Sequence, residues 1–306
     1  MQRSLKSTVR FDGFGLHSGC RVSLAVHPAA AGFGIWFKRT DVNLVDQLVK
    51  ADWRNVVQSP LCTQLMNDAG TTVATVEHLM AALAGCGIYN ALIEIDGPEV
   101  PILDGSSQPL VQGFIAAGID NLAGNAVSIR ILKTVEVRLG QALARLAPSK
   151  MLEISFSIDF VDVAIGYQEK TLNMSNGAFV RELSDSRTFC MQQDVDVMHA
   201  HGLALGGTLD NAVVFENGKV LSPGGLRHFD EPVRHKMLDA LGDLALTGAP
   251  VLGRYTGVFA GHALTNSLLR ALFDDPSAYE ITPVGVSIGN LLPGMGLKVS
   301  DIPIHV

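Results

Sequence analysis

The segment Arg234–Asp243 holds the densest group of side chains in the sequence that could carry out chemistry. On a helix, His235 and Asp239 stand one turn apart on the same face, and Asp243 follows one turn later. A neutral imidazole and a carboxylate at this spacing can hold one divalent cation from a single rigid element. An exposed helix face with i,i+4 polar pairs has the same pattern, so this segment alone leaves both interpretations open.

Glu77 and His78 form a second candidate. Adjacent helix residues point about 100° apart, so they cannot both be simple ligands at one depth. One of them could bind a metal while the other faces a water molecule on that metal. With His78, the ligand set would become two histidines and one aspartate, and three protein ligands with an open fourth position are typical of catalytic zinc. A helix-terminal glutamate beside a hydrogen-bonded histidine is the simpler alternative.

His262, which follows Gly261, is the third candidate, and a buried core histidine is its default interpretation. A serine hydrolase is unsupported, because Ser106, Ser107 and Ser186 lie in no nucleophile-elbow pattern.

The elements that must position these residues mix strands and helices. Period-two or short apolar runs predict strands at Val22–Val26, Gly34–Phe37, Ala91–Ile95, Val127–Val137 and Leu152–Phe160. Apolar stripes and end signals predict helices from Thr75, as the N-cap, to about Ala84, and over Pro109–Ala117, Asp230–Thr247 and Asn266–Phe273. Strands and helices do not alternate strictly, so we expect an α+β fold of sheets covered by helices. Asp120–Asn125 is the best candidate linker, and it divides the chain into domains 1–122 and 126–306.

Composition excludes several classes of protein. A net charge of −7 argues against a general nucleic-acid binder. The mean hydropathy of +0.27 is high, but the least charged stretch, Ile281–Leu297, contains two prolines and four glycines and predicts no transmembrane helix. The four cysteines form no CxxC pair, which suits a reducing compartment, and residues 1–10 lack a secretory signal. We therefore expect a cytoplasmic protein.

Taken together, six motifs resemble those of the UDP-3-O-acyl-N-acetylglucosamine deacetylases, the zinc amidases of bacterial lipid A synthesis. They occur in the family's order and span nearly the whole chain. The motifs are Gly15-Leu16-His17-Ser18-Gly19, Thr75-Val76-Glu77-His78-Leu79, Pro101-Ile102-Leu103-Asp104-Gly105-Ser106, Ser186-Arg187-Thr188-Phe189, Val233–Asp243 and Gly261-His262-Ala263-Leu264.

The resemblance implies a role for each residue of the site. His78, His235 and Asp239 would bind Zn²⁺, and such a site would also accept Fe²⁺. Glu77 would be the general base for the water on the zinc, His262 the general acid for the leaving amine, and Asp243 the residue that orients His262. Thr188 and Lys236 would stabilise the oxyanion and hold the substrate, and Phe189 and Leu16 would contact it.

The resemblance also implies a fold and a substrate. Two layered α+β domains would face each other across the active site, each with a small insert. The second insert, near Val161–Met191, would form an apolar passage for the single acyl chain of a UDP-sugar. We expect a monomer that makes at most transient membrane contact through this entrance. Arg227, Arg234 and Lys236 could supply positive potential for the diphosphate.

Overall fold

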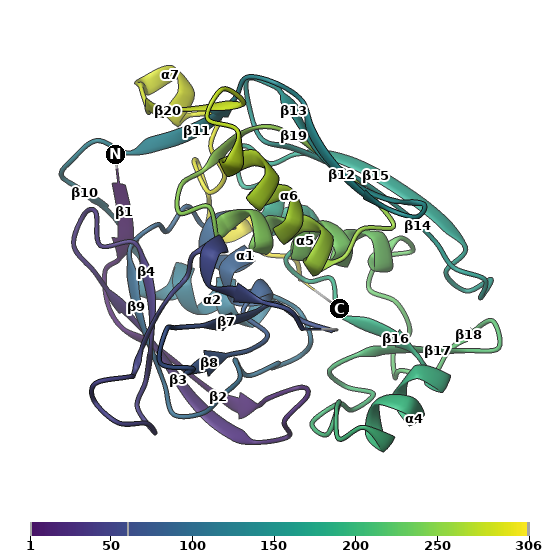
Figure 1. Ribbon diagram of the computed structural model, residues 1–306. Helices are drawn as coiled ribbons and strands as arrows, with labels where there is room; N and C mark the ends of the chain where they lie inside the picture. The colour runs from purple at the N-terminus through teal and green to yellow at the C-terminus, as the bar shows by residue number, and fades with distance from the viewer. Residues whose placement is uncertain (1, 60, 305–306) are drawn as a thin grey trace.

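The N-terminal half of the chain forms a five-stranded sheet and packs two α-helices beside it (Figure 1). The protein is described by a computed structural model over residues 2–59 and 61–304, so Met1 and residues 305–306 of the two predicted domains lie outside it. The elements of this half are β1 Gln2–Leu5, β2 Val9–Phe14, β3 Arg21–Pro28, β4 Ile35–Arg39, β5 Leu48–Lys50, a 3₁₀ turn Trp53–Asn55, β6 Val56–Val57, β7 Gln64–Met66, β8 Thr72–Val73, α1 Glu77–Gly85, β9 Ala91–Ile95, α2 Gln108–Ala117 and β10 Ile119–Leu122. The main sheet has the order β2-β3-β9-β4-β5, while β6, β7 and β8 form a separate small sheet.

The C-terminal half is built around a seven-stranded sheet. Its elements are β11 Val127–Ile131, β12 Val135–Leu139, β13 Ala142–Pro148, β14 Glu153–Asp159, β15 Tyr167–Asn173, α3 Ala178–Glu182, β16 Phe189–Met191, α4 Gln192–Ala200, β17 Val213–Glu216, β18 Lys219–Val220, α5 Glu231–Ala245, β19 Val251–Val258, α6 His262–Asp274, β20 Tyr279–Pro283, α7 Val286–Gly289 and a 3₁₀ turn Val299–Asp301. The helices α5 and α6 pack on the large sheet, and α4 packs beside the small sheet β16-β17-β18. Among the described residues, no helix combines the length and the apolar character that a bilayer crossing requires.

The predicted α+β class is confirmed, and the predicted central helices and strands are present with shifted ends. Three local expectations are wrong. Thr75 does not cap α1: its backbone has φ +56° and its hydroxyl donates to Glu99, so Val76 is the N-cap. Residues 120–122 are not linker but the end of β10, which pairs with β1. The stretch Val127–Val137 is two strands, because β11 pairs with β19 and β20 while β12 turns away to pair with β13.

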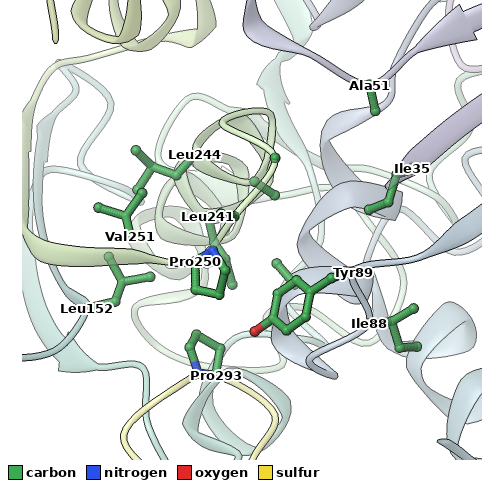
Figure 2. A pocket seen from close by; sticks show the side chains of 14 residues that line it. Ile35, Ala51, Ile88, Tyr89, Leu152, Leu241, Leu244, Pro250, Val251 and Pro293 are labelled. Atoms are coloured by element: carbon green, nitrogen blue, oxygen red, sulfur yellow. The ribbon is translucent and has the colours of Figure 1, made fainter. Parts of the chain in front are cut away.

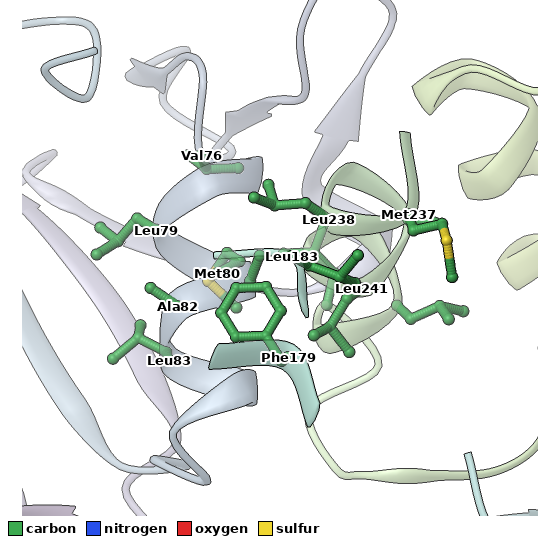
Figure 3. Packing of buried hydrophobic residues seen from close by; sticks show 14 of the residues in the cluster. Val76, Leu79, Met80, Ala82, Leu83, Phe179, Leu183, Met237, Leu238 and Leu241 are labelled. Atoms are coloured by element: carbon green, nitrogen blue, oxygen red, sulfur yellow. The ribbon is translucent and has the colours of Figure 1, made fainter. Parts of the chain in front are cut away.

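The two halves meet where α1 crosses α5. Figure 3 shows Met80 of α1 and Leu241 of α5 in one apolar cluster, with Phe179 of α3 packed between the two helices. The helices approach most closely at Gly242, where a Cβ atom would lie 2.0 Å from the carbonyl oxygen of Glu77. Only glycine fits this crossing, because a Cβ atom cannot come that close to backbone.

A small cavity of about 40 Å³ remains at this seam. Its wall combines Ile35 and Tyr89 of the first half with Leu241 and Pro250 of the second (Figure 2). The Tyr89 hydroxyl points toward Pro250 and Pro293 and has no hydrogen-bond partner among the described residues. The space is large enough to hold water.

We predict that Gly242→Ala destabilises the fold even though alanine is the better helix former. The propensity gain is about 1 kcal/mol, whereas overpacking against backbone costs about 3 kcal/mol. Urea denaturation should therefore show a net loss of about 2 kcal/mol. In the control Gly285→Ala, where a Cβ meets no described atom within 4 Å, the change should stay within about 0.5 kcal/mol. A Gly242→Ala protein as stable as its parent would contradict the close crossing.

Candidate active site

Three potential metal ligands from both halves converge at the crossing of α1 and α5. His78 comes from the first turn of α1, and His235 and Asp239 stand one turn apart on α5. Asp239 Oδ1 lies 3.3 Å from His235 Nε2 and 3.6 Å from His78 Nε2. All three side chains are buried, and their ligand atoms lie within 4.8 Å of one another. The helical i,i+4 spacing thus brings His235 and Asp239 together as the sequence predicted, and α1 adds His78.

Both imidazoles are held in the neutral form that binds metals. Burial, together with the neighbouring His235, lowers the pKa of His78 to about 3. Burial also lowers the pKa of His235. The Nδ1–H group of His235 donates to the carbonyl oxygen of Ser186 at 2.9 Å, which leaves the Nε2 lone pair directed toward Asp239 and His78.

The carboxylate of Asp239 is arranged for a cation. Burial raises its pKa, but the surrounding side chains, of which Lys236 and His262 are charged, outweigh burial and hold the pKa well below its usual range. Its Oδ1 atom is buried and accepts no hydrogen bond from the described residues, a costly state unless a cation lies beside it. A tetrahedral ion with bonds of about 2.0–2.1 Å needs ligand atoms about 3.3 Å apart, so the distances from Asp239 to the two imidazoles suit a small divalent ion.

Glu77 and His262 face each other beside this ligand set. The closest atoms of the pair, Glu77 Oε1 and His262 Nε2, are 3.7 Å apart, and the same nitrogen lies 3.9 Å from Asp239 Oδ2. Burial raises the pKa of the Glu77 carboxyl to about 7. Burial lowers the pKa of His262, but the carboxylates of Asp243 and Glu77 outweigh it and raise the value to about 9. Asp243 Oδ2 accepts from His262 Nδ1 at 2.9 Å and so fixes the ring.

Lys236 and Thr188 border the same space. The Lys236 ammonium donates to Asp239 Oδ2 at 3.0 Å. Thr188 lies just before β16, where its backbone N–H donates to Gly105 and its carbonyl accepts from Val213. The fixed backbone holds the side chain of Thr188 at the wall of the pocket described next.

A pocket of about 670 Å³ opens from the metal-ligand set. Its polar end carries Glu77 and His262, and Leu16 and Phe189 are also in its wall. The apolar part is lined largely by residues of 189–214, including α4 and β17. The expected insert at Val161–Met191 was therefore placed too early, because β15 belongs to the large sheet and α3 packs in the core.

The sequence of this chain is similar to those of known proteins. A sequence model of the family described as LpxC, UDP-3-O-acyl N-acetylglycosamine deacetylase, matches residues 2–274. The chain belongs to this family. Proteins named UDP-3-O-acyl-N-acetylglucosamine deacetylase are similar to it at 46% identity in Phenylobacterium zucineum, 42% in Shewanella frigidimarina and 43% in Actinobacillus succinogenes. These matches cover 92%, 96% and 94% of this chain and 96%, 97% and 97% of the respective relatives.

Two arginines that we expected near the diphosphate serve other contacts in this deacetylase-family chain. Arg227 donates to Asp104 Oδ2 at 3.0 Å and to the carbonyl oxygen of Asp185 at 2.8 Å. Arg234 forms ion pairs with Asp230 and Glu182. Neither arginine is among the residues that line the pocket, whereas Lys236 is. The positive-potential hypothesis is therefore unsupported for Arg227 and Arg234.

His17 is a pocket residue to which the sequence assigned no role. Its backbone N–H donates to Glu99 Oε1 at 2.9 Å, and its buried Nδ1 atom has no hydrogen-bond partner among the described residues. Burial lowers its pKa. The Gly15–Gly19 motif carries His17, but nothing in the spacing of that motif indicates that the ring enters the pocket of this family member.

We predict that the metal-free protein binds one divalent ion at His78, His235 and Asp239 and gains thermal stability. Zn²⁺ at 100 times its Kd should add about 2.7 kcal/mol, or about 4 °C in Tm for a chain of this length. Asp239→Ala should abolish this metal-dependent shift, measured by calorimetry after chelation. The control Asp274→Ala, an exposed carboxylate at the end of α6, should keep it; an unchanged shift in Asp239→Ala would reject the site.

Proposed function

We propose that this chain hydrolyses the N-acetyl group of UDP-3-O-acyl-N-acetylglucosamine, releasing acetate and a free amine, as an early step of lipid A synthesis. The observation that carries the proposal is the pair Glu77 and His262, two proton-transfer groups that face each other at 3.7 Å beside the buried ligand set. Membership of the deacetylase family supports the substrate. A protein that only bound nucleotide sugars would need neither of the two groups.

His78, His235 and Asp239 would hold the metal ion. We assign Zn²⁺ because two neutral imidazoles and one carboxylate are ligands that zinc prefers in catalytic sites, and Fe²⁺ would suit the same atoms. When bound, the ion supplies a Lewis acid that polarises the amide carbonyl and promotes ionisation of water.

Glu77 and His262 divide the proton transfers. The Glu77 carboxylate accepts a proton as the water oxygen bonds to the acetyl carbon. The His262 imidazolium then donates its Nε2 proton to the amide nitrogen as the C–N bond breaks, so the amine leaves neutral. Asp243 holds Nδ1 of the same ring at 2.9 Å and stabilises its charged form. Each transfer is worth roughly 10²–10⁴-fold in rate.

The remaining residues act on the substrate. Lys236 and Thr188 stabilise the negative charge that develops on the acetyl oxygen, because both lie in the pocket wall beside the ligand set. Phe189 and Leu16 contact the sugar and the first part of the acyl chain. The apolar wall over residues 189–214 receives the rest of the chain.

We also infer a cytoplasmic monomer. The four cysteines are all free, as expected in a reducing compartment. Every residue assigned to the reaction belongs to one chain, so the site needs no second copy. Contact with a membrane is limited to the time in which an acylated sugar enters or leaves.

We predict that Glu77→Gln loses activity but keeps its metal. The amide cannot accept a proton, so kcat should fall by about 10²-fold or more, while metal analysis should still find one ion per chain. The control Glu216→Gln, at the exposed end of β17, should match the parent in both measurements. Acetate release from Glu77→Gln at the parental rate would remove Glu77 as the base.

The pH dependence of kcat/KM should be bell-shaped. Activity rises with pH as Glu77, with its pKa raised to about 7, loses its proton, and it falls as His262, with its pKa raised to about 9, loses its own. A bound cation lowers both values, because positive charge favours the carboxylate and disfavours the imidazolium. His262→Gln should lower kcat by about 10²-fold and remove the basic limb. A basic limb that persists in this variant would have another origin.

We predict that the apolar wall of the pocket lowers KM for substrates that carry the 3-O-acyl chain. Ala212→Phe, a substitution in this wall, should raise KM at least about 10-fold for a long-chain 3-O-acyl substrate, since each buried methylene is worth about 0.8 kcal/mol. It should leave turnover of the sugar without the chain unchanged. The control Ala200→Phe, at the exposed end of α4, should change neither. Equal effects of Ala212→Phe on both substrates would contradict an acyl passage there.

A further inference from the structure

Thr63 forms hydrogen bonds with both Glu77 and Asp243, the two carboxylates next to His262. It precedes β7 in the small sheet β6-β7-β8 and is 3% exposed. Its backbone N–H donates to Glu77 Oε2 at 3.0 Å, and its hydroxyl donates to Asp243 Oδ1 at 2.6 Å. One buried residue thus contacts both the carboxylate assigned as the base and the carboxylate that holds the assigned acid.

The contacts leave Thr63 little freedom. Its carbonyl oxygen accepts from the N–H of Val76, the N-cap of α1, at 3.3 Å. The main chain of Thr63 therefore runs along the start of α1, while its side chain reaches α5, 180 residues away in the sequence. Each atom of Thr63 that can form a hydrogen bond is used, so the residue is fixed relative to both helices.

The Thr63 hydroxyl also completes the hydrogen bonding of Asp243. The Oδ2 atom of that carboxylate accepts from His262 Nδ1, and its Oδ1 atom accepts from Thr63. Without the hydroxyl, Oδ1 would be buried without a donor, and the carboxylate could rotate away from the direction that holds the imidazole. At Glu77, the backbone N–H of Thr63 donates a hydrogen bond to Oε2, so Oε1 is the atom that faces His262.

We propose that Thr63 is a positioning residue that sets the distance between base and acid through Glu77 and Asp243. This inference rests on the proposed function, and it gives the small sheet β6-β7-β8 a part in the reaction. The hydroxyl acts only through Asp243 and His262, and the backbone amide only through Glu77. Substrate binding does not depend on either contact.

Removing the hydroxyl should therefore lower kcat and spare KM. A hydrogen bond to a charged group is worth about 10- to 100-fold, so Thr63→Val should lose about that factor in kcat, with KM within about 2-fold. Thr63→Ser keeps the hydroxyl and should recover kcat to within about 3-fold of the parent. The control Ser4→Ala also removes a buried hydroxyl that bonds backbone, to Asn90 and Ala29, and should lower Tm without changing kcat.

A double-mutant cycle separates positioning from a general loss of structure. In a His262→Gln background, Thr63→Val should cost less than about 2-fold, because the group through which it acts is gone. An additive loss there, or a Thr63→Ser variant as slow as Thr63→Val, would overturn the inference. Acetate release by the parent in the same assay tests the proposed function independently: an inactive parent would reject that function, whereas an active parent with a fully active Thr63→Val would reject only the role of Thr63.

Discussion

The contact between the Gly242 backbone on α5 and the Glu77 carbonyl on α1 is the constraint on which the site depends. Helices normally stay 8–10 Å apart because side chains separate them, and a missing Cβ removes that spacing here. The close crossing brings the first turn of α1 against the middle turns of α5. His78 of α1 then lies close to His235 and Asp239 of α5. Glu77 lies beside His262, the ring that Asp243 holds. The same crossing buries the helices deeply enough to suppress protonation of two imidazoles.

Charge balance explains why so many ionisable groups can share this buried space. Glu77, Asp239 and Asp243 bring three interacting carboxylates to one buried place, and among the described side chains Lys236 and a charged His262 oppose them. The two ligand imidazoles contribute nothing, because burial keeps them neutral. A divalent cation beside Asp239 Oδ1 would supply the missing positive charge and a partner for an otherwise unpaired oxygen. The metal site and the acid–base pair are thus one electrostatic unit, in which a bound cation lowers the pKa values of Glu77 and His262.

The sequence predicted those residues of the site whose positions follow from their spacing along the chain. The i,i+4 relation of His235 and Asp239 follows from helix geometry, and the six ordered motifs assigned the remaining ligand. It missed Thr63 and His17, because their roles depend on contacts with Asp243 and Glu99 that no local pattern describes. It also misread Thr75, since a threonine before an apolar run usually caps a helix, whereas here its hydroxyl is bound by a buried glutamate. The pocket wall was placed too early because only the resemblance set its position, and the pairing of β15 with β14 puts that strand in the large sheet instead.

The burial of α1 has a consequence for how the protein is made. From Glu77 to Gly85 nearly every residue of this helix is buried, and α5 and α3 cover it from the C-terminal half. When the N-terminal half leaves the ribosome, those covering helices have not yet been synthesised, and α1 exposes apolar surface together with the Glu77 carboxyl. Exposed apolar surface of this kind favours aggregation, so we expect partly synthesised chains that lack α5 to need chaperone protection.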